Sequence, residues 1–302
     1  MTNHAQVESI EQRRYTLAFS AVLLSSCLNS VGGLLVRSLE TATDWQIVFY
    51  RGMALAVAMS VLFILRYRNR VIVEFRRIGR WNFAGGLFYG AATACYVLSL
   101  THTTVANTLF VLSAIPFFTA VLAWVFLKES VRRGTWIAMA AALVGVGVMV
   151  GEGFAAGTVF GNLTALVSAL SFSCFVVTLR RDQATDMLPS VGIGALIATL
   201  TAALMAGGDL AVLPGDLALC IVWGGIVSCT AQFLLVFGSR QLLGAELTLL
   251  VLVEFILGPF WVWLFVNEVP SILTLIGGVI VLSAVAGRAL TGMRPRPPHS
   301  TV

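Results

Sequence analysis

Two ionisable residues stand inside long apolar segments, where a charge is costly. Glu254 lies near the middle of one such segment, and Arg51 lies about one turn from the end of another. At the depth of a bilayer an ionisable group costs roughly 2.5 to 3.5 kcal/mol on insertion scales, so by default it faces the interior of a helix bundle. Both residues are therefore candidates for contact with a polar solute.

The chemistry of these two side chains has more than one interpretation. A carboxyl away from water favours its neutral form, so Glu254 is a candidate to contact a solute amine or to carry a proton. It could equally be a hydrogen-bonded carboxyl that holds helices together. Arg51 could bind a solute carboxylate, pair with an acid, or extend to the headgroups of the membrane.

Smaller polar and aromatic side chains occur at similar depth. A solute path needs such groups, because a uniformly apolar bundle has nothing to hydrogen-bond a solute, although serine and threonine also join membrane helices without binding anything. The candidates for substrate binding or coupling are Ser26, Asn29, Tyr89, Tyr96, Asn107, Ser113, Ser173 and Gln232.

Two prolines are candidates for hinges. Pro116 and Pro259 each remove a backbone hydrogen bond from an apolar helical segment, and each is expected to bend it. Gly86 with Gly90, and Gly147 with Gly151, have the GxxxG spacing that predicts close helix contacts.

The sequence predicts no catalytic, metal or cofactor site. Its three histidines have no metal-ligand spacing, and no HExxH, GxSxG or phosphate-binding loop occurs. The five cysteines fall in apolar segments at spacings that suit neither metal nor redox chemistry, so we interpret them as small buried hydrophobes. A membrane enzyme is therefore the least favoured class, and direct use of ATP is not expected.

The elements that must position these residues are membrane helices. Of 302 residues, 58% are hydrophobic and only 11% are charged, which is roughly half the charged fraction of a soluble domain. The mean hydropathy is +0.93. Continuous apolar runs favour helices over a barrel, whose strands would alternate. The expected spans are 15–36, 46–65, 82–100, 104–127, 134–151, 160–179, 188–207, 217–237, 245–266 and 270–289.

The basic residues predict the orientation. Nearly all of the 19 Lys and Arg residues fall in alternate connecting segments, with Arg37 as the exception outside and Arg51 inside a span. Because Lys and Arg are retained on the cytoplasmic side, both termini are expected in the cytoplasm. The net charge of +5 is thus an orientation signal, and no nucleic-acid partner is expected. The ends, 1–14 and 290–302, are expected to be cytoplasmic tails, with disorder in the first dozen residues and in 294–302.

An internal repeat relates the two halves of the chain. A shift of 139 residues places Ala106 on Ala245, Trp124 on Trp263 and Glu129 on Glu268 without a gap. The shift spans five helices, an odd number, so the halves are inverted, as in many transporters. The repeats are expected at 15–151 and 160–289. The two glutamates mark turns and are expected to cap the following helix or to pair with an arginine.

At these residues the chain resembles the EamA family of the drug/metabolite transporter superfamily. The resemblance lies in YVLSLTHTTVANTLFVLSAIPFFTAVLAWVFLKE at 96–129, GNLTALVSALSFSCFVVTLRR at 161–181 and AELTLLVLVEFILGPFWVWLFVNE at 245–268. Members of that family commonly place a proline directly after the glutamate of the ninth helix, whereas Phe255 follows Glu254 here and the proline is Pro259.

The resemblance implies a particular function. The expected protein is an all-α integral membrane transporter of ten helices in the inner membrane, as a monomer or weak homodimer, that exports small solutes such as aromatic or other neutral amino acids or related metabolites. Proton coupling and simple facilitated export both stay open. The alternatives are a channel-like facilitator and a membrane assembly subunit that transports nothing.

Overall fold

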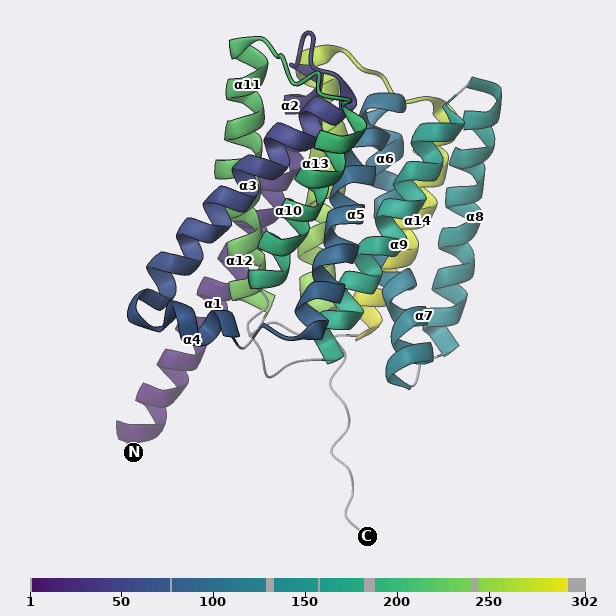
Figure 1. Ribbon diagram of the computed structural model, residues 1–302. Helices are drawn as coiled ribbons and strands as arrows, with labels where there is room; N and C mark the ends of the chain where they lie inside the picture. Colours follow the sequence, from purple (N-terminus) through teal and green to yellow (C-terminus); the bar gives the residue numbers. More distant parts are fainter. Residues whose placement is uncertain are drawn as a thin grey trace.

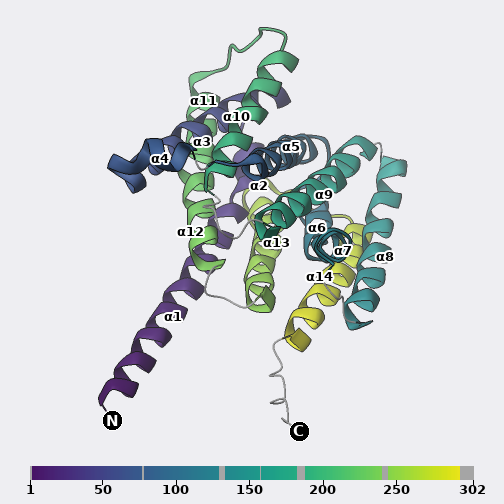
Figure 2. The same ribbon diagram turned by 60° about the horizontal axis from the view of Figure 1, so that its bottom comes forward.

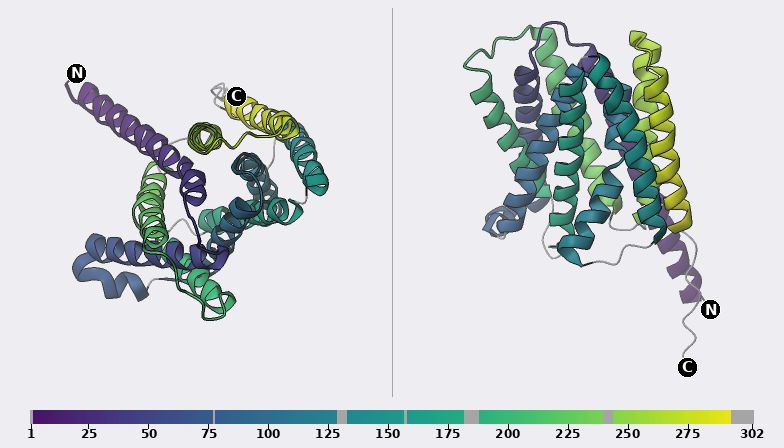
Figure 3. Two further views of the ribbon diagram at one scale, coloured as in Figure 1. Left: turned by 90° about the horizontal axis from the view of Figure 1, so that it is seen from above. Right: turned by 90° about the vertical axis from the view of Figure 1, so that its right-hand side faces the viewer.

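The computed structural model describes residues 2–76, 78–128, 133–156, 158–181, 188–239 and 244–292. In this part of the chain the regular structure is entirely helical, and the long helices run alongside one another in one bundle (Figure 1). The beginning of α1 and the end of α14 lie at the same end of the bundle, which we call the terminal end (Figure 3).

The helices follow the order of the apolar segments. The first group is α1 Thr2–Ser30, α2 Gly32–Arg37, α3 Asp44–Tyr67, η1 Arg68–Arg70, α4 Val71–Arg76, α5 Arg80–His102, α6 Val105–Leu112, α7 Ile115–Leu127 and α8 Arg133–Ala156. The second group is α9 Val159–Arg181, α10 Leu188–Met205, α11 Pro214–Ile221, η2 Val222–Ser228, α12 Cys229–Ser239, α13 Gly244–Val266 and α14 Ile272–Gly292.

Seven helical segments of the described chain are long and apolar enough to cross a membrane. They are Gln12–Arg37, Asp44–Phe75, Arg80–His102, Val105–Leu127, Val159–Thr178, Leu188–Met205 and Pro214–Gly238. Shorter apolar stretches lie in α8, α13 and α14. Large apolar side chains such as Leu204 and Ile137 are exposed on the outside of the bundle. Such an apolar outer surface is what contact with lipid requires. The chain is a multi-pass membrane protein.

Local sequence explains where several helices begin and end. Thr43 and Gln46 form a capping box at the start of α3, which satisfies backbone N–H groups that the helix leaves free. Lys128 and Asn267 adopt left-handed backbone angles, with φ of 56° and 57°, directly after α7 and α13. Gly207 does the same after α10, as residues that end helices commonly do.

The structure differs from the sequence prediction at four places. The first dozen residues, expected to be disordered, continue α1 back to Thr2, because no Gly or Pro interrupts them; this part protrudes from the bundle (Figure 2). The first span breaks at Val31, between α1 and α2. The segment 68–76, expected as a loop, forms η1 and α4. The eighth span contains a π-helix, η2, which no sequence signal predicted.

Helices from the two halves of the chain interleave. From the first half of the chain, α5 packs against α9 and α10 of the second half, and α7 packs against α9. From the second half of the chain, α12 and α13 pack against α1 of the first half, and η2 packs against α3. Two further pairs, α3 with α10 and α8 with α14, also join the halves.

Glycines allow the closest of these helix contacts. A Cβ on Gly194 in α10 would lie 2.6 Å from the backbone oxygen of Gly86 and 2.9 Å from the backbone nitrogen of Gly90. The contact predicted for the first GxxxG pair is therefore confirmed. The prediction for the second pair is wrong at Gly147, which faces open space, whereas Gly145 on another face of α8 would meet the Gly277 carbonyl at 2.7 Å.

Candidate functional site

Arg51 is a buried cation with unused hydrogen-bonding capacity. Its side chain projects from α3 into the bundle, and the residue is only 6% exposed. Nη2 lies 3.4 Å from the Ser228 hydroxyl. Nε and Nη1 have no hydrogen-bond partner among the described residues. Burying such a group without partners is costly, so this position is unlike an ordinary packing site.

Aromatic rings cover the guanidinium. Its central carbon lies 4.3 Å from the centre of the Trp223 ring and 5.9 Å from that of Tyr96. These are cation–π distances, and such contacts stabilise a cation most when it is desolvated. The guanidinium thus lies over two aromatic rings, while two of its nitrogens keep unpartnered N–H groups.

The π-helix η2 explains why Trp223 and Ser228 both reach Arg51. In a π-helix the backbone hydrogen bond spans five residues, so residues five apart lie above one another on one face. Gly224 then permits the contact, because a Cβ there would overlap the backbone carbonyl oxygen of Arg51. The combination of a glycine and a π-turn places α3 directly against η2.

Glu254 lies in a second part of the same cluster. The Asn29 side chain in α1 forms a hydrogen bond with the Glu254 carboxyl in α13. Tyr96 in α5 interacts electrostatically with both Glu254 and Arg51. The cluster therefore contains one acidic side chain, Glu254, and one basic side chain, Arg51, and the Tyr96 phenol interacts with both.

Gly32 provides space for the aromatic part of the cluster. Both the Tyr96 hydroxyl and the Trp223 indole nitrogen lie 3.2 Å from the position that a Cβ would take on Gly32. Tyr89, two helical turns before Tyr96, interacts electrostatically with Arg51 and packs 5.1 Å from the ring of Phe175. We call the set Asn29, Arg51, Tyr89, Tyr96, Trp223, Ser228 and Glu254 the central cluster.

Other predicted site residues make contacts outside the central cluster. Asn107 in α6 donates hydrogen bonds to Asn162 in α9 and to the Thr103 hydroxyl, the latter at 3.0 Å. The Ser113 hydroxyl donates to the Phe110 carbonyl, and that of Ser173 to the Ile115 and Ala169 carbonyls. The contacts of Asn107 with Asn162 and of Ser173 with Ile115 join helices in the way the alternative interpretation expects, whereas the bond of Ser113 stays within its own turn.

The remaining candidates occupy helix interiors. Ser26 is buried in α1, and Gln232 is half-buried in α12. Pro116 stands in the first turn of α7, directly after the break at 113–114. Pro259 lies within α13, which continues past it. Glu129, the repeat counterpart of Glu268, lies outside the described residues.

An ion pair closes the opposite end of the bundle. Arg37 Nε at the end of α2 lies 2.6 Å from Glu268 Oε2 in the loop after α13. Glu268 Oε1 accepts a hydrogen bond of 2.7 Å from the backbone N–H of Val105. Arg37 also donates to the carbonyls of Leu100 and Thr103, at 2.7 and 2.8 Å. We call this arrangement the clasp; the predicted pairing of Glu268 with an arginine is confirmed.

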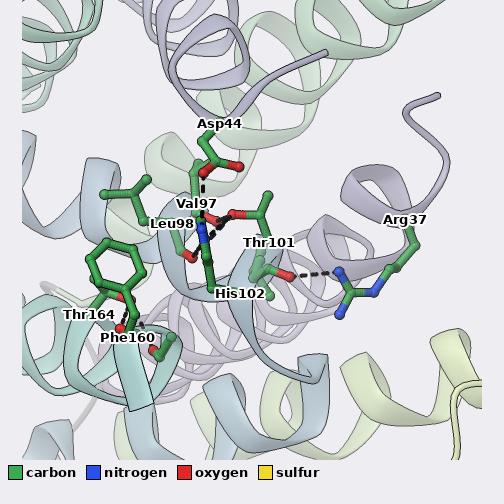
Figure 4. A network of polar contacts seen from close by, with 10 residues as sticks. Arg37, Asp44, Val97, Leu98, Thr101, His102, Phe160 and Thr164 are labelled. Atoms are coloured by element: carbon green, nitrogen blue, oxygen red, sulfur yellow. Dashed lines mark hydrogen bonds and ion pairs between the residues drawn. The ribbon is translucent and has the colours of Figure 1, made fainter. Parts of the chain in front are cut away.

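Further polar contacts surround the clasp. Asp216 in α11 accepts four hydrogen bonds from the α2–α3 loop, from the backbone of Glu40, Thr41 and Ala42 and from the Thr41 hydroxyl. His102 Nε2 lies 3.5 Å from Asp44, and its Nδ1 is 3.0 Å from the Leu98 carbonyl (Figure 4). This end of the bundle is therefore tied together by loops from both halves.

Sequence reasoning missed Trp223 and Gly32. Neither carries a signal in the sequence, because a tryptophan in a membrane helix and a glycine in a Gly-rich one are both common. Among the described residues, no group of three or more His, Cys, Asp or Glu side chains is placed to hold a metal ion.

Comparison with known proteins finds the same resemblance in the first half of the chain. Residues 15–151 match the EamA-like transporter family. The chain is 25% identical over 276 residues to the pseudopaline exporter CntI of Pseudomonas aeruginosa. The aligned region covers 87% of this chain and 92% of that protein. It is 28% identical over 207 residues to the uncharacterized transporter YdfC of Bacillus subtilis, covering 66% and 67% respectively. A crystal structure matches 94% of this chain and all of its own with a TM-score of 0.64 at 17% identity, which supports the fold alone.

Proposed function

We propose that this member of the EamA-like transporter family is a secondary exporter of small solutes that works by alternating access. The solutes we favour are amino acids, aromatic or otherwise neutral, and related metabolites. The observation that carries the proposal is the central cluster, which contains a buried cation on α3 and a half-buried acid on α13. These helices belong to different halves of the chain, so relative movement of the halves would act directly on a bound solute.

An inverted repeat of five helices in each half is part of the proposal, with the repeats at 15–151 and 160–289. The 139-residue shift carries the bounds of α6–α7, Val105–Leu127, onto those of α13, Gly244–Val266. It also carries Lys128 onto Asn267, and both have the left-handed backbone conformation. Equal helix length and equal termination support a common ancestral unit in the two halves.

Helix contacts support the same pairing of halves. A pseudo-twofold axis that relates the repeats exchanges α1–α2 with α9, α3 with α10, α5 with α11–α12, α6–α7 with α13, and α8 with α14. The contact of α5 with α9 then has its counterpart in α12 with α1, and that of α7 with α9 in α13 with α1. Because transporters built from inverted repeats bind solutes at the repeat interface, the central cluster is well placed for this role.

The basic side chains support cytoplasmic termini. The exposed residues Arg66, Arg80, Lys128 and Arg133 belong to helix ends and connections on the terminal end of the bundle. The clasp, at the opposite end, has Arg37. By the positive-inside rule the terminal end is cytoplasmic and the clasp faces outward, so we expect the clasp to open when a solute leaves the cell.

The exporter CntI supports the direction of transport. It matches nearly the full length of this chain, and its name assigns export of a small molecule. We propose Pro116 and Pro259 as the hinges of the movement. Pro116 lies in the first turn of α7 directly after the break at 113–114, and Pro259 removes a backbone hydrogen bond within α13.

Counterflow in proteoliposomes tests the proposal. Vesicles loaded with unlabelled neutral amino acids are diluted into trace labelled amino acid, and a carrier is expected to accumulate the label transiently and to saturate. Empty vesicles and vesicles with heat-denatured protein are the controls. Flux without saturation or trans-stimulation would indicate a channel-like facilitator, and no flux with any of the neutral or aromatic amino acids would contradict the amino-acid assignment.

A further inference from the structure

The edges of the Arg51 guanidinium carry buried N–H groups that lack a hydrogen-bond partner. A guanidinium offers two bidentate edges in its plane, Nε with Nη2 and Nη1 with Nη2. Because Nε and Nη1 are both unpartnered, each edge contains an unused donor. The single contact to Ser228, at 3.4 Å, is long for a hydrogen bond to a charged group.

No acid of the described chain neutralises Arg51. The ion pairs of Arg37 with Glu268 and of His102 with Asp44 do not involve Arg51. The groups that interact electrostatically with Arg51 are Tyr89, Tyr96 and Cys220, whose ordinary forms at neutral pH are uncharged. Glu254 interacts with Tyr96 and is hydrogen-bonded to Asn29. The cation and the acid of the central cluster therefore have separate surroundings.

The aromatic residues define what else the ligand would contact. The guanidinium carbon lies 4.3 Å from the centre of the Trp223 ring, and the Trp223 indole nitrogen and the Tyr96 hydroxyl converge at Gly32. The surroundings of Arg51 thus combine flat apolar surfaces with two N–H or O–H groups. Such a setting suits a planar carboxylate attached to an apolar or aromatic group better than it suits a strongly hydrated inorganic anion.

The geometry points to Arg51 as the recognition site for a carboxylate of the transported solute, bound edge-on to the guanidinium beside Trp223 and Tyr96. This inference rests on the proposed function and specifies its substrate class: the solute must carry a carboxylate. A solute that fills this site supplies the partner that the buried cation lacks. It follows that Arg51 destabilises the empty protein and stabilises the loaded one.

Matched pairs of carboxylates and amides test this directly in the purified, detergent-solubilised protein. The probes are phenylacetate with phenylacetamide, and L-phenylalanine with L-phenylalaninamide. When the probe is added in excess over the protein, at least one carboxylate is expected to raise the melting temperature by about 3 °C or more. The corresponding amide is not expected to raise it. If no carboxylate stabilises the protein more than its amide does, the inference is wrong.

Variants of Arg51 separate recognition from packing. Arg51→Gln is expected to melt at the same temperature as the wild type or higher without a probe, and to lose the stabilisation by the carboxylate. Arg51→Lys, which keeps the charge but not the fork, is expected to bind at least about 10-fold more weakly. The control is Arg66→Gln, the same change at an exposed site on α3. A large loss of stability in Arg51→Gln, or full stabilisation by the carboxylate in that variant, would overturn the inference.

The same probes distinguish this inference from the proposed function. If the carboxylate and its amide support counterflow equally, the proposed export function stands and the proposed carboxylate site at Arg51 is contradicted. Specific binding of a carboxylate without counterflow would keep the anion site and contradict transport.

Discussion

Arg37 and Glu268 come from opposite halves of the chain and meet at 2.6 Å, with side chains 23% and 17% exposed. Each is bound again by the α5–α6 turn, Glu268 through the Val105 N–H and Arg37 through the Leu100 and Thr103 carbonyls. Three segments that are distant in sequence are therefore joined through one ion pair. The clasp is the structural element that must open if solute passes this end of the bundle.

The ion pair should show measurable coupling. We expect the free energies of unfolding of Arg37→Gln, Glu268→Gln and the double variant to give an interaction energy of about 1–3 kcal/mol, because the pair is mostly buried and hydrogen-bonded. Thermal unfolding in detergent measures it. Asp44→Asn, which removes the exposed contact with His102, serves as the control and should change stability by less than about 0.5 kcal/mol. Additive effects of the two clasp variants would show that the clasp is not a unit.

Asp216 should be essential to the stability of the α2–α3 loop. Its carboxylate is 2% exposed and accepts four hydrogen bonds from this loop. Asp216→Asn turns one acceptor into a donor that faces backbone N–H groups, so we expect a loss of about 2 kcal/mol or more. Asp209→Asn is the matched change at the same end, where the carboxylate accepts one long bond of 3.4 Å from Ala211. Equal melting temperatures for the two variants would count against this role.

Two glycines with opposite surroundings should respond oppositely to alanine. Gly194→Ala places a Cβ against the backbone of Gly86 and Gly90, and backbone atoms in packed helices cannot move aside cheaply. We expect a loss of about 1–3 kcal/mol. Gly147→Ala meets open space and should stabilise α8 by up to about 1 kcal/mol. Melting of both variants in the same detergent compares them; a neutral Gly194→Ala would show that α5 and α10 pack less closely.

Glu254→Gln tests proton coupling. A carboxyl that carries protons is needed for net flux driven by a proton gradient, but not for exchange of solute for solute. We therefore expect Glu254→Gln to keep exchange in proteoliposomes and to lose most gradient-driven flux. Asn29→Ala removes the hydrogen-bond partner of Glu254 without removing the carboxyl, and should retain both activities in part. Equal loss of exchange and of driven flux in Glu254→Gln would instead indicate a role in binding or folding.

Much of the framework could be read from the sequence, and the reasons are physical. Lipid demands long apolar helices, so the order of the helical segments followed directly. Glu268 marks a turn and was expected to cap the following helix or to pair with a loop arginine; it pairs with Arg37 at the end of α2. Arg51 and Glu254 were identified because an ionisable group at bilayer depth needs a reason to be there.

The positions of individual side chains could not be read in the same way. A helix in lipid is apolar on every side, so periodicity does not tell which face meets another helix. Asn107 was a candidate for the solute path, yet its amide binds Asn162 on α9. Trp223 was not considered, since only the π-turn of η2 and the small Gly224 bring it onto Arg51. Such local changes of helical register have no simple pattern in the sequence.

Accessibility at position 228 tests alternating access most directly. Ser228 touches Arg51, and Ser228→Cys in a protein whose five native cysteines are alanine is a nearly isosteric reporter. A membrane-impermeant thiol reagent is applied from either face of oriented vesicles, with and without Glu268→Gln to open the clasp. Opening the clasp is predicted to speed labelling from the clasp face and to slow it from the terminal face by a similar factor. Faster labelling from both faces, or labelling from neither, would contradict the account.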